Sequence, residues 1–379
     1  MELRPLTSLR FLAALAIVFH HLAGIMWIPA GFFAPYSLGI TVSLFFVLSG
    51  FVLHYSYHDR LSQTGWIGFS IQRFMRIWPA HVAVIALSAI WIQIPLIQFH
   101  TERQTTSEVL QVIFLLQAWN QKPIVFRGLN GPSWSISVEL FFYLAFPALL
   151  FALSRIAAGW FLIGAFLVSL LWLVGASIFL FNPEREFHAL ALAYIFPIAR
   201  LAEFCAGMAL SKLLLGNIER LRAAPQWLWT AVEVFTLCLV VLVVGNVGYI
   251  SHLAGEAGVN PVFRQWINSS GGVVVFALLI AVLAVGRGMV SWVLNAPVLF
   301  WLGRISFSMY LVHQPLIYHW TREVVPAQPS LFWQVVGYFI VLIGFSALLH
   351  IFVELPGVRA GKWLSTRLQG MQHKVPVNS

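Results

Sequence analysis

Charged residues are scarce in this chain. Only 9% of its 379 residues are Asp, Glu, Lys or Arg, whereas 60% are hydrophobic. Soluble domains carry about 25% charged residues, so this composition excludes an ordinary soluble globular protein. The apolar runs are long enough to cross a membrane as helices, and they lack the short alternating pattern of outer-membrane strands. We predict an all-α, polytopic integral membrane protein.

Cysteine is also rare, and the sequence signatures of several enzyme classes are missing. Cys205 and Cys238 both lie in apolar runs, so they say little about the redox compartment. The sequence has no P-loop, no dinucleotide-binding glycine fingerprint, no His-Glu-x-x-His and no Gly-x-Ser-x-Gly. Metal and hydride chemistry therefore lack support, and we expect neither a metal nor a nucleic-acid partner.

The apolar runs divide the chain into about ten candidate transmembrane helices. Their approximate ranges are 8–28, 38–57, 77–97, 133–153, 159–181, 188–212, 227–246, 271–288, 296–318 and 331–354. We expect one membrane-embedded domain over residues 1–379, with helices within about 8–354 and a basic cytoplasmic tail over 355–379. The less apolar segment 106–119 should lie at the interface or fold into the third connection.

The distribution of basic residues predicts the orientation. If the N-terminus is inside, most lysines and arginines fall in the inner segments, as the positive-inside rule requires. Both termini are then cytoplasmic, and the long connections 98–132 and 247–270 lie outside, where they can cover a substrate site. The first apolar run contains His20 and His21 and no signal-peptide cleavage site follows, so we expect a retained helix.

Arg10 and His21 are the first candidate site residues. They are separated by about three helical turns, so their side chains point within about 20° of each other and differ in depth by about 16 Å. An ionisable residue within a membrane is a functional hypothesis by default. His20 points about 100° away from Arg10, so we favour His21.

Arg73 and Arg76 are three residues apart and share one helix face at the predicted cytoplasmic surface. Two guanidiniums on one face can clamp phosphate groups, because each can bind bidentately. Anchoring of the following helix by basic residues is the simpler alternative. With Arg10 on the same side, a shared anion site becomes more plausible.

Two further segments place polar groups among apolar ones. Gly50 should let another helix backbone approach closely, and the neighbouring Ser49 is a nucleophile, a hydrogen-bond donor or a packing residue. Trp134 lies near the start of a helix entered from the outside, and Glu139 follows one to two turns later. A buried carboxylate must be neutralised or paired. Glu139 is therefore a structural partner of an arginine or histidine, or the orienter or proton acceptor of an imidazole.

Tyr310 and His313 are also three residues apart and share a helix face. Pro315 follows directly and should bend or loosen this helix. His313 is either a structural residue or a direct part of the active site.

Two more pairs of ionisable residues have helical spacing. Arg200 and Glu203 should form an ion pair within the membrane. His350 and Glu354 are a weaker case near the inner end of the last helix.

Together these segments resemble membrane-bound acyltransferase family 3. The matching pieces, in the family's order, are Arg10 with ten residues before His21, FFVLSGFVL at 45–53, RFMRIWPA at 73–80, WSISVELFFY at 134–143, RLAEFCAGM at 200–208 and SFSMYLVHQP at 306–315. Each piece alone is weak, but the ordered set spans nearly the whole chain and is specific. The family's Glu-Arg-Pro-like ending appears here as Glu354-Leu355-Pro356, which departs from the pattern.

The resemblance implies a multi-pass O-acyltransferase of the bacterial inner membrane. Such an enzyme would move an acetyl group from cytoplasmic acetyl-CoA to a hydroxyl of a cell-surface or exported polysaccharide, or of its lipid-linked precursor. The family's essential arginine and histidine map to Arg10 and His21, and its paired-arginine motif maps to Arg73 and Arg76. Membrane lipid and a glycan acceptor are the expected partners.

On this interpretation Arg10, Arg73 and Arg76 hold the CoA phosphates, and His21 acts as the general base. Glu139 or Tyr310 orients the imidazole or the sugar. Direct transfer and an acyl-enzyme through Ser49 or His21 both stay open. Four polar or aromatic side chains are expected to contact the substrate: Ser49, Trp134, Tyr310 and His313.

Two other function classes are compatible with the composition. A transporter would use the intramembrane histidine, glutamate and arginine residues as a proton relay, although no internal repeat is visible. A glycan flippase without chemistry would make no use of a phosphate clamp on the cytoplasmic side. The acceptor, the acyl group and the oligomeric state are open at this point.

Overall fold

Helices make up nearly all of the regular structure in the computed structural model, which describes residues 3–25, 36–91, 98–99, 102–185, 187–327 and 330–372. The elements of the first half are α1 (Arg4–Ile25), η1 (Leu38–Ile40), α3 (Thr41–Tyr57), α4 (Leu61–Thr64), α5 (Trp66–Trp91), β1 (Gln98–Phe99), β2 (Glu102–Arg103), α6 (Thr106–Ile113), η2 (Gln117–Trp119), α7 (Pro123–Phe126), η3 (Gly131–Ser133), α8 (Trp134–Arg155), α9 (Ala158–Gly175) and η4 (Ala176–Leu180). The elements of the second half are α10 (His188–Leu190), η5 (Ala191–Ile195), η6 (Pro197–Arg200), α11 (Leu201–Leu215), α12 (Ile218–Arg222), α13 (Gln226–Glu256), α14 (Pro261–Ser270), α15 (Val273–Val285), α16 (Met289–Leu294), α17 (Pro297–His319), η7 (Trp320–Val324), α18 (Leu331–Leu349), η8 (His350–Glu354) and α19 (Leu355–Gln372).

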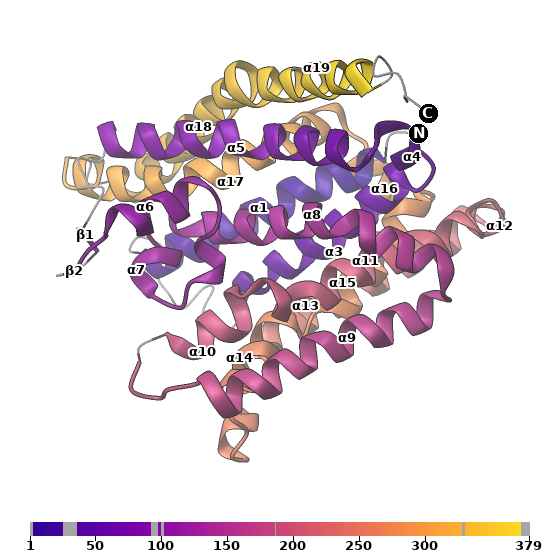
Figure 1. Ribbon diagram of the computed structural model, residues 1–379, viewed down its shortest axis with the longest axis horizontal. Coiled ribbons are helices and arrows are strands. Elements are labelled where there is room, and N and C mark those ends of the chain that lie inside the picture. Colours follow the sequence, from indigo (N-terminus) through magenta and orange to yellow (C-terminus); the bar gives the residue numbers. More distant parts are fainter. Residues whose placement is uncertain are drawn as a thin grey trace, which may run out of the picture.

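The long helices form one bundle whose two ends carry different connections. The short helices α4, α12 and α16 gather at one end, and α6, α7 and α10 gather at the opposite end (Figure 1). The basic residues of the sequence predict that the end with α4, α12 and α16 is cytoplasmic. The two-residue strands β1 and β2 pair antiparallel in the connection beside α6.

Seven helical segments of the described chain are long and apolar enough to cross a membrane. An eighth is the pair His188–Ile195 and Pro197–Leu215, which is bent by 48° at the break between its two halves. α5 and α17 also run along the bundle but are not among these seven or eight. The chain is therefore an all-α polytopic membrane protein, as its composition predicts, and the count of ten spans stays a prediction.

α3 lies at the centre of the bundle, where it crosses α11 at close range. Of its apolar window, 72% is buried, compared with 17% for α13 at the periphery. A side-chain carbon added to Gly50 would lie 1.9 Å from the carbonyl oxygen of Phe204, and one added to Gly207 would lie 1.9 Å from that of Val47. The predicted close approach at Gly50 is thus confirmed, and two glycines allow it.

α5 begins at Trp66, well before its predicted start at residue 77. Gly65, in the left-handed region at φ 70°, ends α4, and the chain then enters α5 directly. Arg73 and Arg76 consequently lie inside a helix, not in front of one. α1 likewise begins at Arg4, ahead of the predicted residue 8.

The predicted outer connection over 247–270 is wrong. α13 continues as far as Glu256, and α14 follows after Gly258, which has φ 79°. The side chain of Asn260 caps α14 by accepting a hydrogen bond from the Val262 amide at 2.9 Å, and Pro261 occupies the first turn. These capping residues start a helix where polar composition alone indicates a loop.

The described part of the connection 98–132 is folded, and the segment 106–119 lies in it as predicted. The end of α6 is fixed to the middle of α5, because Trp78 Nε1 donates to Ile113 O at 3.0 Å and His81 Nε2 lies 2.8 Å from Val112 O. Near the start of α8, Ser137 Oγ donates to Leu115 O at 2.6 Å. This connection therefore packs against the middle of α5 and the start of α8.

The basic tail after Glu354 is helical over its described part. α18 passes through the π-helical turn η8 into α19, which packs along α5 (Figure 1). Gly357 permits the contact, since a side-chain carbon there would lie 2.6 Å from Met75 O. The last helix was expected to end near residue 354, and the structure continues the helix through the predicted basic tail as far as Gln372.

Two buried carboxylates hold the bundle together away from the candidate site. Glu203 lies 3.1 Å from Arg200 and accepts a hydrogen bond from Ser43 at 2.7 Å, so the predicted ion pair is confirmed. Glu233 of α13 accepts from the backbone amides of Gly288 and Val290 at 3.0 and 2.7 Å, at the start of α16. A carboxylate there complements the free amides and the dipole of the helix N-terminus.

The close crossing of α3 and α11 gives a first test. Gly50→Ala should destabilise the protein by about 1–3 kcal/mol, because the added methyl group has no space beside Phe204 O. Gly164→Ala is the matched control, since nothing lies within 4 Å of its added carbon. Thermal unfolding in detergent measures both. Equal midpoints for the two variants would contradict the close approach.

Candidate active site

A polar cavity of about 360 Å³ lies between α1, α3, α5, α8, α17 and the segment that joins α18 to α19. Five helices bring six of the predicted site residues to its wall: Arg10, Ser49, Arg73, Arg76, Glu139 and Tyr310. These residues span most of the sequence, so only the folded bundle brings them together. The cavity is therefore the candidate active site.

Arginines outnumber carboxylates on the cavity wall. Arg10, Arg73, Arg76 and Arg304 face it, together with Glu139 and Glu354. Among the described residues, no ion pair joins any of these arginines to a carboxylate. An unpaired cation in a low-dielectric site favours binding of an anion.

The two cavity glutamates are satisfied by other partners. Glu139 accepts hydrogen bonds from the hydroxyls of Tyr143 and, at 3.3 Å, Ser49. Glu354 accepts from His350 at 2.8 Å and from Ser308 at 3.0 Å. The predicted pairing of His350 with Glu354 is thus confirmed, whereas Glu139 has neither an arginine nor an imidazole as its hydrogen-bond partner in these contacts.

Arg73 is the most firmly held of the cavity arginines. Its Nη2 donates to Tyr57 Oη at 2.6 Å, and its guanidinium carbon lies 4.8 Å from the centre of the Tyr57 ring. Its Nε is buried without a hydrogen-bond partner. A planar cation fixed in this way keeps donors directed at a ligand without a carboxylate neutralising it.

Two further cavities connect this site to the end of the bundle that carries α4. One, of about 460 Å³, shares Thr7, Arg10 and Val52 with the polar cavity and reaches Arg60. The other, of about 430 Å³, shares Arg73 and Arg76 and reaches Lys362. A long anionic ligand entering from this end would pass Arg60 or Lys362 before it reaches the cavity arginines, although Asp59 also lines the first of these two cavities.

Tyr310 closes the deep end of the cavity. Its hydroxyl lies 2.8 Å from Ser135 Oγ and donates to Pro132 O at 3.2 Å. The ring of Phe45 lies edge-on to the Tyr310 ring at 5.9 Å between centroids. The wall at this depth therefore consists of aromatic rings and hydroxyl groups.

His21 and His313 form a hydrogen-bonded pair beyond Tyr310. His21 Nδ1 lies 2.9 Å from His313 Nε2, and His313 Nδ1 donates to the backbone oxygen of Tyr310 at 2.6 Å. With both rings neutral, this order makes His21 Nδ1 the donor to His313 and leaves His21 Nε2 with a free lone pair. His313 is fully buried and His21 is half-buried.

His21 and Arg10 do not face the same space, although they lie on one helix. Arg10 lines the cavity and His21 does not. The described contacts link His21 to the cavity through His313 and Tyr310. The contacts of His21 depend on the direction of its side chain and on the position of the neighbouring helix α17. Helical spacing in the sequence gives neither of these.

Trp134 also lies away from the cavity wall. Its ring packs 4.6 Å from that of Tyr194 and edge-on to that of Phe46. Tyr143, by contrast, lines the cavity and bonds to Glu139 without having been assigned a role from sequence. Its position four residues after Glu139 is the signal that could have identified it, because residues at that spacing share a helix face.

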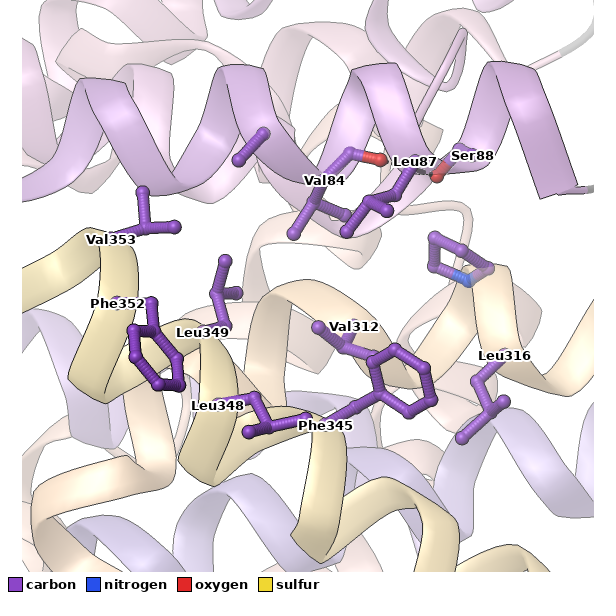
Figure 2. Close-up of a pocket in the computed structure, with 12 residues that line it drawn as sticks. Val84, Leu87, Ser88, Val312, Leu316, Phe345, Leu348, Leu349, Phe352 and Val353 are labelled. Atoms are coloured by element: carbon purple, nitrogen blue, oxygen red, sulfur yellow. Dashed lines mark hydrogen bonds between the residues drawn. The ribbon is translucent and has the colours of Figure 1, made fainter.

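A second hollow, between α5, α17 and α18, has a different chemistry. It measures about 210 Å³, and Figure 2 shows apolar side chains over nearly all of its wall, including Leu87, Val312, Phe345 and Phe352. Its one hydroxyl, that of Ser88, is bonded to Val84 O at 2.7 Å. This groove offers no group for acid–base chemistry, which concentrates the reactive groups in the polar cavity and the histidine pair.

The architecture and this arginine-lined site define a family. The model of the family described as "Acyltransferase domain", acyltransferase family 3, matches residues 6–351. The chain therefore belongs to this family, as its motifs indicate.

Curated relatives agree with the family. Over 39% of its length the chain is 34% identical to "Acyltransferase MdmB" of Streptomyces mycarofaciens, of which the match covers 39%. Over 86% of its length it is 25% identical to "Peptidoglycan O-acetyltransferase OatA" of Listeria monocytogenes, of which the match covers 51%. The matches thus span about half, or less, of these relatives. No solved structure gives a significant match.

The path into the cavity gives a second test. In a background with Cys205→Ala and Cys238→Ala, Ser49→Cys should react with a small water-soluble thiol reagent supplied to the cytoplasmic side, because Ser49 lines the cavity. Ser169→Cys is the control, since Ser169 is buried outside the cavity. Labelling of inverted vesicles followed by mass spectrometry measures both. Equal labelling from either face would contradict the one-sided opening.

Proposed function

We propose that this protein is an O-acetyltransferase of the bacterial inner membrane, which moves an acetyl group from cytoplasmic acetyl-CoA to a hydroxyl of a cell-surface or exported polysaccharide or its lipid-linked precursor. The observation that carries the proposal is the set of arginines without carboxylate partners on one cavity wall. Membership of an acyltransferase family supports transfer chemistry over the rival transporter and flippase functions.

The donor is expected to enter from the end that carries α4. CoA bears several phosphate groups, and Arg10, Arg73 and Arg76 offer guanidinium groups that can bind phosphate bidentately. The basic side chains Arg60 and Lys362 lie at the openings of the adjoining cavities. The flexible arm of CoA would extend toward Tyr310 and bring the thioester to the deep end.

His21 is the proposed general base. With His313 accepting the proton of Nδ1, His21 Nε2 can take the proton of an acceptor hydroxyl. The hydroxyl oxygen then forms a bond to the thioester carbonyl carbon, the carbon–sulfur bond breaks, and the CoA thiolate takes the proton held by His21 and leaves as the thiol. Tyr310 and Ser135 stand between the two half-sites, so transfer requires this layer to admit the thioester.

The acceptor is expected from the opposite side of the membrane. Tyr310 and His313 would contact it at the deep end, and Ser49 and Glu139 would orient either substrate. OatA is named for peptidoglycan, and this supports a glycan acceptor as the first class to test.

Replacement of His21 tests the chemistry. His21→Ala should insert and fold normally but lower the acetylation of the acceptor glycan by about 100-fold or more, since a lost general base costs that much. Mass analysis of glycans from a deletion strain carrying the variant measures the effect. His20→Ala serves as the control. Normal acetylation by well-expressed His21→Ala would remove His21 from the mechanism.

Replacement of two cavity arginines tests the proposed donor site. The double variant Arg73→Ala, Arg76→Ala should bind acetyl-CoA more weakly by about 100-fold or more, because each of the two charge-assisted hydrogen bonds contributes about 1.5–3 kcal/mol. Arg185→Ala, exposed in the connection before α10, is the control. Calorimetry on purified protein measures the affinities. Unchanged binding by the double variant would disprove the clamp.

A further inference from the structure

The π-helical turn η8 has two chemically different faces. His350 and Glu354 line the polar cavity, whereas Leu349, Phe352 and Val353 line the apolar groove of Figure 2. Within the described chain, the other π-helical turns, η4, η5 and η7, contribute nothing to the polar cavity. Such turns are uncommon and frequently occur at functional sites.

Glu354 fixes the orientation of the His350 ring. Its Oε2 lies 2.8 Å from His350 Nδ1 and accepts a second hydrogen bond from Ser308 at 3.0 Å. His350 Nδ1 therefore carries a proton, and Nε2 is the nitrogen left to meet another group. The carboxylate acts here as a positioning group.

His350 Nε2 has no hydrogen-bond partner although it is buried. Only 8% of the residue is exposed, and the residue faces the cavity. A buried polar atom without a partner costs free energy, and such atoms in native proteins call for an explanation. A ligand in the cavity that supplies a hydrogen bond would remove this cost.

The surroundings of His350 narrow the choice of ligand group. The wall of this cavity combines apolar side chains, among them Ile77, Phe307 and Leu355, with arginines. The phosphate-binding arginines Arg73 and Arg76 lie on α5, the helix packed against η8. A chain that begins at an anionic end, held by these arginines, and carries a polar group farther along would bring that group to His350.

We propose that His350, held by Glu354, hydrogen-bonds an amide group of the donor's pantetheine arm. This inference rests on the proposed use of acyl-CoA. A secondary amide has one donor and one acceptor, so it can pair with Nε2 of a neutral or a charged imidazole. The arginines then recognise the phosphates, and His350 recognises the arm that joins them to the thioester.

Two ligands separate these contributions: CoA, and adenosine 3′,5′-bisphosphate, which has phosphates but no pantetheine arm. His350→Phe should weaken the binding of CoA about fivefold, the effect of one neutral hydrogen bond, and leave the bisphosphate unchanged. The double variant of Arg73 and Arg76 should weaken both. Calorimetry on the full-length protein in detergent gives the dissociation constants.

The controls use the same turn of helix. Phe352→Ala, on the groove face, should bind both ligands as the unmodified protein does, and His350→Gln, which keeps hydrogen-bonding groups, should lose less affinity for CoA than His350→Phe. His350→Met replaces His350→Phe if the aromatic variant does not fold. Equal loss for both ligands, or no loss for CoA, would overturn the assignment. Failure of the unmodified protein to bind either ligand would instead contradict the proposed donor.

Discussion

The cost of placing ionisable side chains among apolar helices organises this molecule. Most of the buried charges are neutralised within the bundle: Arg200 by Glu203, and Glu233 by the amides at the start of α16. The cavity arginines are the exception, since no carboxylate pairs with them in the described residues. Because an unpaired cation is expensive in a low-dielectric medium, its persistence in the fold indicates a site that an external anion completes.

One residue joins the polar cavity to the histidine pair. Tyr310 uses its hydroxyl to bond Ser135 and its backbone oxygen to hold His313. It therefore contributes to both the floor of the cavity and the tautomer of the proposed base. In the proposed transfer the layer formed by Tyr310 and Ser135 would have to admit the thioester, so it would also control how far water from the mouth reaches the histidines.

The sequence predicts the fold class and the main groups of the site, but not their connections. Helical spacing identified Arg73 with Arg76, Arg200 with Glu203, and His350 with Glu354, because all of these contacts are local. It could not predict that His21 meets His313 or that Glu139 meets Ser49, since both contacts join helices distant in the sequence. The helix over 247–256 was missed because its glycines and polar residues suggest a loop, although Tyr249, Ile250 and Leu253 continue the apolar run.

The π turn η8 also determines how the C-terminal helix is oriented. A π turn takes about one residue more than an α-helical turn, so everything after it is rotated by about 100° relative to an uninterrupted helix. That rotation gives Gly357 its contact with Met75 O and Ser365 its hydrogen bond from Gln72 at 3.1 Å. The π turn η8 thus acts as a one-residue insertion in the helix: without it, Lys362 would turn away from the cavity mouth.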